Sequence, residues 1–416
     1  MRRLIYIFII GLLLCSYTWA DGSRYASKSL LSEGKWVKIR VDKTGIYKLS
    51  YADLKNMGFS DPSKVSVHGY GGWPLDEDFS KEYIDDVPST PVWRGSDYLL
   101  FYGKGPVKWE YDSSSQTFVH TNNPYSLYGY YFVTDATPTN DMTSVAQASG
   151  ATNRITTYDD YLVHEQELVS LAKSGRELYG EDFSGATPRT LSTFSSIPGI
   201  TNEDAKVTMS FVSKVTSGTG VASLSINQSN VLDVSIRSNR EEYVKALEGV
   251  STAVWKGEKS EKNSVVVSYN SASHNNVRLN YVRLHFKRTL QPYGAYTFFR
   301  SIASIGNVSR FVVQGANANT LVFDVTDAQR VRLMETELNG SELTFSIPAG
   351  TLREFVLVRT DQSFISPEVV GEVENQNLHA LEQKDMIIIA AKAFQTQAER
   401  LAEEHRATDG LTVEVV

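Results

Sequence analysis

Short segments in which apolar and polar residues alternate recur along most of this chain. Residues 36–41 (WVKIRV) show the pattern, because every second residue from Val37 onward is apolar, as in a strand with one buried face. Similar segments follow at short intervals, with turn signals such as Asn339-Gly340 between them. Tyr (22) and Phe (18) are plentiful, and aromatic residues favour strands. The pattern therefore predicts a mainly β fold of sandwich or jelly-roll type.

The strand segments fall into two regions. A chain of 416 residues is expected to form two or three domains of roughly 100–200 residues each. We predict an N-terminal β-rich domain over residues 21–175, with one short helix over 51–57 that begins after Ser50 and stops at Gly58. A β-sandwich domain is predicted over residues 176–375. Residues 158–176 fit either a helix or an extended crossover, and the sequence does not decide between them.

The first twenty residues have the organisation of an export signal. Arg2 and Arg3 precede an apolar run over residues 4–14, and Thr18 and Ala20 supply small side chains for a cleavage site. The run has 11 residues, whereas a membrane-spanning helix needs about 20. Residues 1–20 are therefore predicted to be a cleaved secretory signal peptide. No other stretch resembles a transmembrane span.

The chain has a single cysteine, Cys15, which lies inside this apolar run. A single thiol forms no internal disulfide and no multi-thiolate metal site. Leu14 stands where a lipoprotein signal usually has a small residue, so a lipid anchor is not favoured. The formal net charge is −7, and an acidic surface does not attract phosphate backbones. Nucleic acid is therefore not an expected partner.

The last forty residues change character. Residues 385–390 form a continuous apolar run, as in a parallel strand buried on both faces. A helix is predicted over 394–406, with one apolar stripe formed by Phe394, Ala398, Leu401 and Ala402, and a stop at Asp409-Gly410. A second strand over 411–416 completes a βαβ unit.

One βαβ unit covers the first of these strands on one face only. A fully buried apolar side chain contributes about 1.5–3 kcal/mol, and a domain has a net stability of about 5–15 kcal/mol. We therefore expect residues 376–416 to be the start of a truncated α/β domain. The alternative is that the unit packs back onto the preceding sandwich.

Three stretches carry a resemblance to a known family. They are residues 36–41 with 44–54, residues 174–183, and residues 385–389 with 397–402 and 410–416. In order and spacing the chain resembles the N-terminal part of the gingipain-type cysteine peptidases of Bacteroidetes, and among these the sortase of the type IX secretion system. The likeness spans most of the mature chain, and its third stretch opens the family's peptidase domain.

The resemblance implies an exported endopeptidase in which a cysteine thiolate attacks the peptide carbonyl and a histidine carries the proton. The sortase cleaves C-terminal signals from secreted cargo, so protein cargo and the outer-membrane secretion machinery are the implied partners. It also implies a location at the outer-membrane-associated cell surface or outside the cell. In the family the Cys/His pair lies further along the chain than Val416. No catalytic, cofactor-binding or metal-binding residue is therefore assigned, no cofactor is expected, and this fragment is expected to be inactive.

Several residues have a candidate function and a simpler structural interpretation. None of the seven histidines has a metal-ligand spacing such as His-Glu-x-x-His. For His405 a solvated helix face is favoured, for His285 a partly exposed sheet position, and for His68, which precedes a glycine cluster, a turn that needs positive φ. The histidines are His68, His120, His164, His274, His285, His379 and His405.

Two clusters remain open to interpretation. An acidic run suits Ca²⁺, but its spacing does not match an EF-hand loop and a hydrated loop is favoured. It consists of Asp76, Glu77, Asp78, Glu82, Asp85 and Asp86. The aromatic cluster Tyr125, Tyr128, Tyr130, Tyr131 and Phe132 fits a sugar-binding platform, but strand core is favoured. The competing function for the whole chain is that of a non-enzymatic surface β-sandwich protein that binds glycans or proteins.

Overall fold

The computed structural model describes residues 25–78, 80, 81, 84–171, 173, 177–215, 217–239, 246–271, 274 and 276–416. The chain divides into two compact units. The larger unit comprises residues 35–82 and 88–373, and the smaller one comprises residues 1–34, 83–87 and 374–416. The predicted signal peptide lies outside the described residues. None of the helices in the described ranges is long and apolar enough to cross a membrane.

The first part of the larger unit contains two small sheets that share one core. A five-stranded sheet has the order β27-β1-β9-β3-β4, and a three-stranded sheet has the order β2-β6-β5. Their strands are β1 (Trp36–Val41), β2 (Gly45–Ser50), β3 (Ser66–Gly71), β4 (Ser89–Thr90), β5 (Val92–Arg94), β6 (Tyr98–Gly103), β9 (Gly129–Thr134) and β27 (Glu368–Val373). Helix α2 (Tyr51–Asn56) begins after Ser50, whose Oγ accepts the Asp53 N–H at 3.0 Å. The buried core includes Ile39, Leu49, Leu54, Phe101 and Tyr131.

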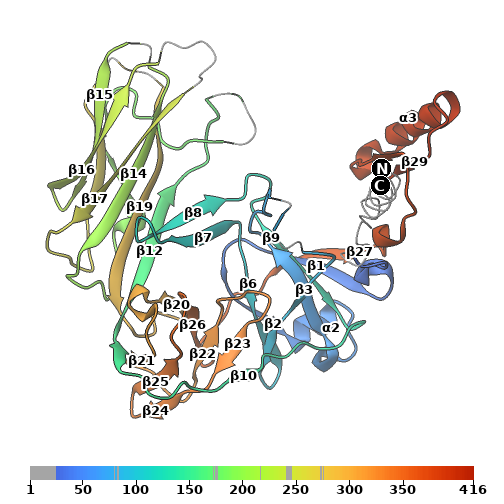
Figure 1. Ribbon diagram of the computed structural model, residues 1–416, viewed down its shortest axis with the longest axis horizontal. Helices are drawn as coiled ribbons and strands as arrows, with labels where there is room; N and C mark the ends of the chain where they lie inside the picture. The colour runs from blue at the N-terminus through green and yellow to red at the C-terminus, as the bar shows by residue number, and fades with distance from the viewer. Residues whose placement is uncertain are drawn as a thin grey trace, which may run out of the picture. The chain divides into compact units, whose positions relative to one another are not determined.

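A nine-stranded sheet forms the rest of the framework (Figure 1). Its order is β10-β23-β22-β26-β20-β12-β19-β14-β17. Its strands are β10 (Ser144–Val145), β12 (Thr157–Glu165), β14 (Ala205–Ser213), β17 (Leu247–Trp255), β19 (Val277–Thr289), β20 (Tyr296–Arg300), β22 (Thr320–Asp324), β23 (Arg332–Met334) and β26 (Glu354–Arg359). The sheet is shared by two sandwich cores, because a different four-stranded sheet packs on each of its halves.

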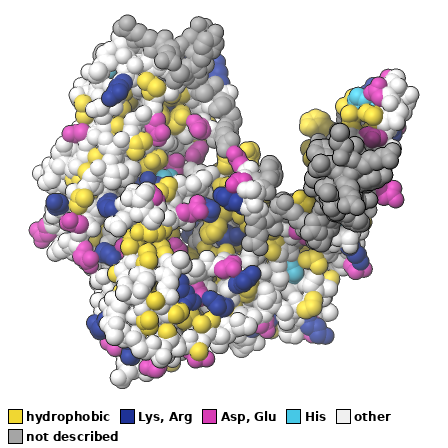
Figure 2. Space-filling model, in the orientation of Figure 1, with side chains coloured by type: hydrophobic (Ala, Val, Ile, Leu, Met, Phe, Trp, Pro, Cys, Tyr) yellow, Lys and Arg dark blue, Asp and Glu magenta, His cyan; other side chains and the backbone are white. Residues whose placement is uncertain are grey.

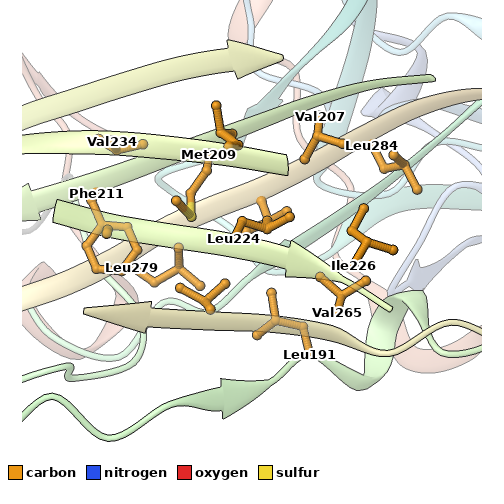
Figure 3. Close-up of a cluster of buried hydrophobic side chains, with 14 of the residues drawn as sticks. Leu191, Val207, Met209, Phe211, Leu224, Ile226, Val234, Val265, Leu279 and Leu284 are labelled. Atoms are coloured by element: carbon orange, nitrogen blue, oxygen red, sulfur yellow. The ribbon is translucent and has the colours of Figure 1, made fainter. Parts of the chain in front are cut away.

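The first sandwich core lies between β12, β14, β17 and β19 and a sheet of order β13-β18-β15-β16. The second sheet contains β13 (Arg189–Thr190), β15 (Thr219–Ile226), β16 (Ser229–Arg237) and β18 (Val265–Tyr269). Figure 3 shows apolar side chains from both sheets meeting in the core, among them Met209, Phe211, Leu224 and Leu279. The burial pattern of β15 alternates strictly, which is the result expected from its sequence.

The second sandwich core is rich in phenylalanine. The sheet β11-β21-β25-β24 packs on the β20, β22 and β26 end of the large sheet. Its strands are β11 (Asn153–Ile155), β21 (Ser309–Val313), β24 (Glu337–Asn339) and β25 (Glu342–Ile347). Phe311 and Phe345 stack with their ring centroids 5.0 Å apart, and Phe299 and Phe355 complete the cluster. The Asn339-Gly340 turn joins β24 to β25, with Gly340 at φ +61°.

The C-terminal segment forms the predicted βαβ unit. Strands β28 (Met386–Ile388) and β29 (Val413–Val415) are parallel, and helix α3 (Gln395–Thr408) connects them. The helix ends at Asp409, and Gly410 follows at φ +67°. The predicted mainly β fold with a terminal βαβ unit is therefore confirmed.

The sequence left helix and extended chain open for residues 158–176, and the first part of this segment, up to Glu165, belongs to strand β12 of the nine-stranded sheet. The sequence did not predict the hairpin of β7 (Val107–Asp112) and β8 (Thr117–Asn122), or the return of β27 to the first sheet. The domain boundaries at residues 20, 175 and 375 stay predictions.

We predict that β27 is needed for the first sheet. A chain ending at Val373 should keep the amides of β1 protected from hydrogen exchange, and a chain ending at Pro367 should not. The shorter chain loses the backbone pairing of five registered residues of β1. At about 0.5–1.5 kcal/mol for each lost hydrogen bond, the first sheet should lose roughly 2–5 kcal/mol. Unchanged protection of β1 in the shorter chain would contradict this prediction.

Candidate functional site

The βαβ unit is held together by polar contacts between its two strands. Asp385, just before β28, accepts hydrogen bonds from the backbone N–H and the hydroxyl of Thr412 at 2.8 and 2.7 Å. These bonds lower the pKa of Asp385, because they stabilise its ionised form. Arg406 of α3 donates to the carbonyl of Val413 at 2.6 Å. The helix is thereby fixed to the strand that follows it.

Much of the apolar surface of this unit is exposed. Ile387 is 56% exposed and Ile389 is 86% exposed. The predicted stripe on the helix is only half right, because Ala398 and Ala402 are buried whereas Phe394 is 64% exposed and Leu401 is 51% exposed. Phe394 precedes the first helical residue, and the small alanines bring the helix close to its strands. The larger apolar side chains are left without cover inside this unit.

The histidines lie in separate places. His405 is partly exposed on α3, and its Nδ1 lies 2.7 Å from Asp409 Oδ2. His379 lies 3.6 Å from Asp85 within the smaller unit. His68 is buried beside Ser66 and Thr137.

The glycines around His68 have the conformation that the sequence suggested. Gly69 and Gly71 have φ values of +142° and +84°. A Cβ on Gly69 would lie 2.8 Å from the carbonyl oxygen of Tyr130, so only glycine fits there. The positive φ values predicted after His68 are therefore confirmed, but the predicted turn is wrong: Gly69 and Gly71 belong to strand β3, where the register with β9 is irregular between His68 and Gly71.

Three other histidines take part in pairs with carboxylates or hydroxyls. His164 bridges Glu181 at 2.7 Å and Thr193 at 2.9 Å. His120 lies 2.9 Å from Glu165. His274 Nδ1 lies 2.5 Å from the hydroxyl of Tyr269. In the described part of the chain no group of three or more His, Cys, Asp or Glu side chains is placed to hold a metal ion.

The acidic run is divided between local turns. Asp76 pairs with Lys81 at 2.6 Å, and Asp78 accepts from Ser80 at 2.7 Å. These bonds lower the pKa of both carboxyls. Asp86 belongs to the smaller unit, where it accepts from Ser29 at 2.9 Å. Glu82 lies outside the described residues.

The aromatic cluster occupies both faces of its strand. Tyr131 is buried in the core, as predicted. Tyr130 lies under the ammonium of Lys38 at 4.1 Å, and Tyr128 lies under the guanidinium of Arg40 at 4.1 Å. Tyr125 is 81% exposed. The strand interpretation therefore holds for Tyr131, whereas the neighbouring rings cover basic side chains.

A buried ionic cluster on β12, β19 and β20 was missed by sequence reasoning. Asp159 is 1% exposed. Its carboxylate lies 3.1 Å from His285 Nε2, accepts from Lys287 Nζ at 3.0 Å and accepts from the Ile302 N–H at 2.7 Å. Arg300, also 1% exposed, donates to the Asp159 carbonyl at 3.3 Å. The expectation of a partly exposed His285 is wrong, because this residue is 9% exposed.

Three further ion pairs balance the charges of this cluster. Arg288 pairs with Asp160 at 2.8 Å, and Arg300 lies 3.6 Å from Asp160 and 3.4 Å from Glu354. Three carboxylates therefore face three basic side chains. Burial raises the pKa of Asp159, but the hydrogen bond from His285 and the charge of Lys287 outweigh it, so the pKa lies below its ordinary value.

The hairpin β7–β8 covers the cluster with aromatic rings. Trp109 stacks on Tyr161 with ring centroids 3.9 Å apart, and Phe118 meets the His285 ring edge-on at 5.2 Å. The guanidinium of Arg300 lies 4.4 Å from the Tyr161 ring centroid. These rings exclude water from the ion pairs, so the cluster fixes the hairpin to the sheet. On the face drawn in Figure 2, acidic and basic side chains are interspersed over the larger unit.

A second buried charge lies beside Gly71 of strand β3. Lys104 is 3% exposed, and its ammonium lies 3.9 Å from the Tyr70 ring centroid and 4.9 Å from that of Trp73. Burial lowers the pKa of Lys104 to about 8, although the charge of Asp327 acts in the opposite direction. The backbone comes close enough for this packing because Gly71 has no side chain: a Cβ there would lie 2.8 Å from Lys104 Cβ.

Replacing Asp159 by asparagine should destabilise the protein by about 3–5 kcal/mol, since the change leaves the Lys287 ammonium without its buried carboxylate partner. Urea unfolding measures the effect, and Asp135→Asn at an exposed position is the control. Because folding lowers the pKa of Asp159, its carboxylate stabilises the folded protein fully above the ordinary carboxyl pKa of about 3.9. This stabilisation is lost as the pH falls through the lowered pKa of the folded protein. Equal stability of the two variants would contradict the prediction.

Lys104 should make the protein more stable as the pH rises from 7.5 to 9.5. The unfolded lysine has a pKa of about 10.4 and binds more protons in this range than the folded one, so the free energy of unfolding should rise by about 1–2 kcal/mol. Lys104→Met should remove this rise. Urea unfolding at several pH values measures it, and equal pH slopes for both proteins would refute the assignment.

Comparison with solved structures gives a strong match. A scan against protein-family models finds no match, and a search of curated proteins finds none either. Among solved structures, the chain is similar to the crystal structure of dimeric latent PorU from Porphyromonas gingivalis, with 32% sequence identity and a TM-score of 0.87. A glucanotransferase from Paenibacillus sp. matches at 6% identity and a TM-score of 0.19, over 51% of this chain and 45% of that one. So weak a likeness carries no argument.

The PorU match covers 94% of this chain and 38% of the PorU chain. The chain thus spans less than half the length of its structural relative. The mainly β architecture of this chain agrees with this match. The similarity to PorU therefore confirms the predicted resemblance, and the chain shares the fold of PorU over nearly all of its own length.

Proposed function

We propose that this chain is the β-rich part of an exported gingipain-type cysteine endopeptidase that acts as a sortase in type IX secretion. The observation that carries the proposal is the similarity to PorU at 32% identity over 94% of the chain. Secreted proteins with C-terminal signals are the proposed substrates. The outer-membrane secretion machinery is the proposed partner, and the signal peptide at residues 1–20 is the proposed route of export.

The proposed catalytic pair lies beyond residue 416 of the natural protein. The one cysteine of the present chain, Cys15, belongs to the proposed signal peptide. The exposed Ile387 and Ile389 support the view that the βαβ unit is the first layer of an α/β peptidase domain, because strands of a parallel sheet are normally covered on both faces. The two sandwiches and the first sheet are proposed to support that domain or to contact the secretion machinery.

The competing function is binding of glycans or proteins by the sandwich. A groove of about 650 Å³ favours it, since its lining includes Asn227, Asn230 and Trp255. However, Trp255 is only 4% exposed, so its ring face is not available to stack on a sugar. The peptidase proposal is therefore the better supported of the two.

A thiol-reactive peptidase probe tests the proposal on the natural full-length protein. We expect labelling that is lost when a cysteine beyond residue 416 is replaced by alanine. The chain over residues 21–416 contains no cysteine and should not be labelled. Absence of labelling of the full-length protein, or labelling unchanged by the substitution, would argue for a binding protein.

A further inference from the structure

A groove of about 450 Å³ lies between helix α2 and strand β27 in the larger unit. Its deepest lining residues, Val37 and Leu49, are 3% and 1% exposed and belong to the core of the first sheet. Helix α2 and the residue after it line one side, and β27 lines the other. The lining residues used below are Val37, Leu49, Asp53, Met57, Val369 and Glu372.

Strand β27 is at the end of its sheet. Among the described strands β1 is its single neighbour, so the other edge of β27 carries backbone groups that no strand pairs. Val369 and Val370 are 48% and 50% exposed. An edge strand beside an apolar groove is the arrangement in which an extended peptide adds to a sheet, with main-chain hydrogen bonds to the edge and alternate side chains in the groove.

The charged residues that line the groove indicate which kind of peptide would bind there. Its charged lining residues are two carboxylates, Asp53 and Glu372. The Glu372 side chain is 64% exposed and lies 3.4 Å from Lys35, so it is only loosely paired. Glu368, at the other end of β27, is already paired with Arg40 at 2.7 Å, so it adds little to the charge that a ligand meets. An incoming strand therefore meets the Glu372 carboxylate at the groove, and a basic residue that faces Glu372 would be stabilised.

We propose that β27 and this groove bind an extended segment of a partner protein, which adds as a strand to the free edge of β27. The segment has apolar side chains at alternate positions, which cover Val369 and Met57, and at least one lysine or arginine, which faces Glu372. This inference does not depend on the proposed peptidase activity.

The same charges disfavour a second copy of this chain as the occupant. In an antiparallel β27–β27 pair, Glu368 and Glu372 of one strand would lie near the glutamates of the other, and like charges across a strand pair are destabilising. The strand also carries an irregular register opposite Lys38 and Ile39, with Gly371 at φ +145°. Charged, bulged edges of this kind prevent indiscriminate pairing, which leaves a charge-matched partner as the favoured one.

Fluorescence anisotropy with the chain over residues 21–416 tests the proposal. The probe is a labelled nine-residue peptide that alternates valine with lysine and threonine, and its matched control has glutamate in place of each lysine. We expect the basic peptide to bind at least about tenfold more tightly than the acidic one. A basic peptide whose central residue is proline should bind weakly, because proline removes a ladder hydrogen bond.

Protein variants locate the binding site. Val369→Asp should weaken binding of the basic peptide about tenfold or more, and Glu372→Lys should reverse the preference between the two peptides. Val370→Asp is the matched control, because Val370 is equally exposed but does not line the groove. Val369 and Val370 are 48% and 50% exposed, and the side chain of Glu372 is 64% exposed. The three variants are therefore expected to fold.

Four results would overturn the proposal. They are no binding up to about 1 mM peptide, equal binding of the basic and acidic peptides, an equal loss of affinity in Val369→Asp and Val370→Asp, and dimerisation of the chain through β27. Light scattering on the wild type and Glu372→Lys measures the last of these.

Discussion

The pairing of β1 with β27 joins two segments that are far apart in the sequence, since Arg40 and Glu368 form a bidentate ion pair across 328 positions. Closing so long a loop costs conformational entropy that grows only slowly with its length. Five registered residue pairs and this ion pair offset that cost. As a result β1 is an interior strand, with β9 on its other side, and the first sheet depends on residues that follow both sandwiches. Because β27 pairs with β1 at this edge of the sheet, it forms one side of the groove beside α2.

The ionic cluster around Asp159 has a different role. A buried ion pair is weak evidence for stability, because removing its charges from water costs several kcal/mol. Here several partners offset the cost: Asp159 has three, and Arg300 lies between Asp160 and Glu354, although His285 Nδ1 and Arg300 Nε are buried without a hydrogen-bond partner among the described residues. Such a set is satisfied in one geometry only. It therefore favours one register of β12 against β19 and one position of the β7–β8 hairpin, whose Trp109 and Phe118 exclude water.

The strands that sequence reasoning predicted have the signal in their own residues, which alternate in β1 and β15 and form a short apolar run in β26. It missed features whose cause lies elsewhere in the chain. Asp159 looks like a surface residue because its partners His285 and Lys287 are more than 120 positions away. His285 lies on the polar side of β19, which is solvent-exposed unless another element covers it, and that element is a hairpin at residues 107–122. The apolar stripe predicted on α3 assumed one broad buried face, but the buried residues of the helix are Ala398 and Ala402.

Strands β27 and β28 both leave valine or isoleucine side chains exposed, and their chemistry differs. Ile387 of β28 has apolar neighbours on both sides in sequence and no charge in the strand, which is typical of a strand covered on both faces by its own domain. β27 instead carries Glu368, Glu372 and a glycine at positive φ, features that protect an edge from unselective pairing. Protection of this kind is unnecessary for a surface that is permanently buried. The two proposals for these surfaces therefore differ in chemistry: a folded layer of the same protein is proposed for β28, and a charge-matched partner segment is proposed for β27.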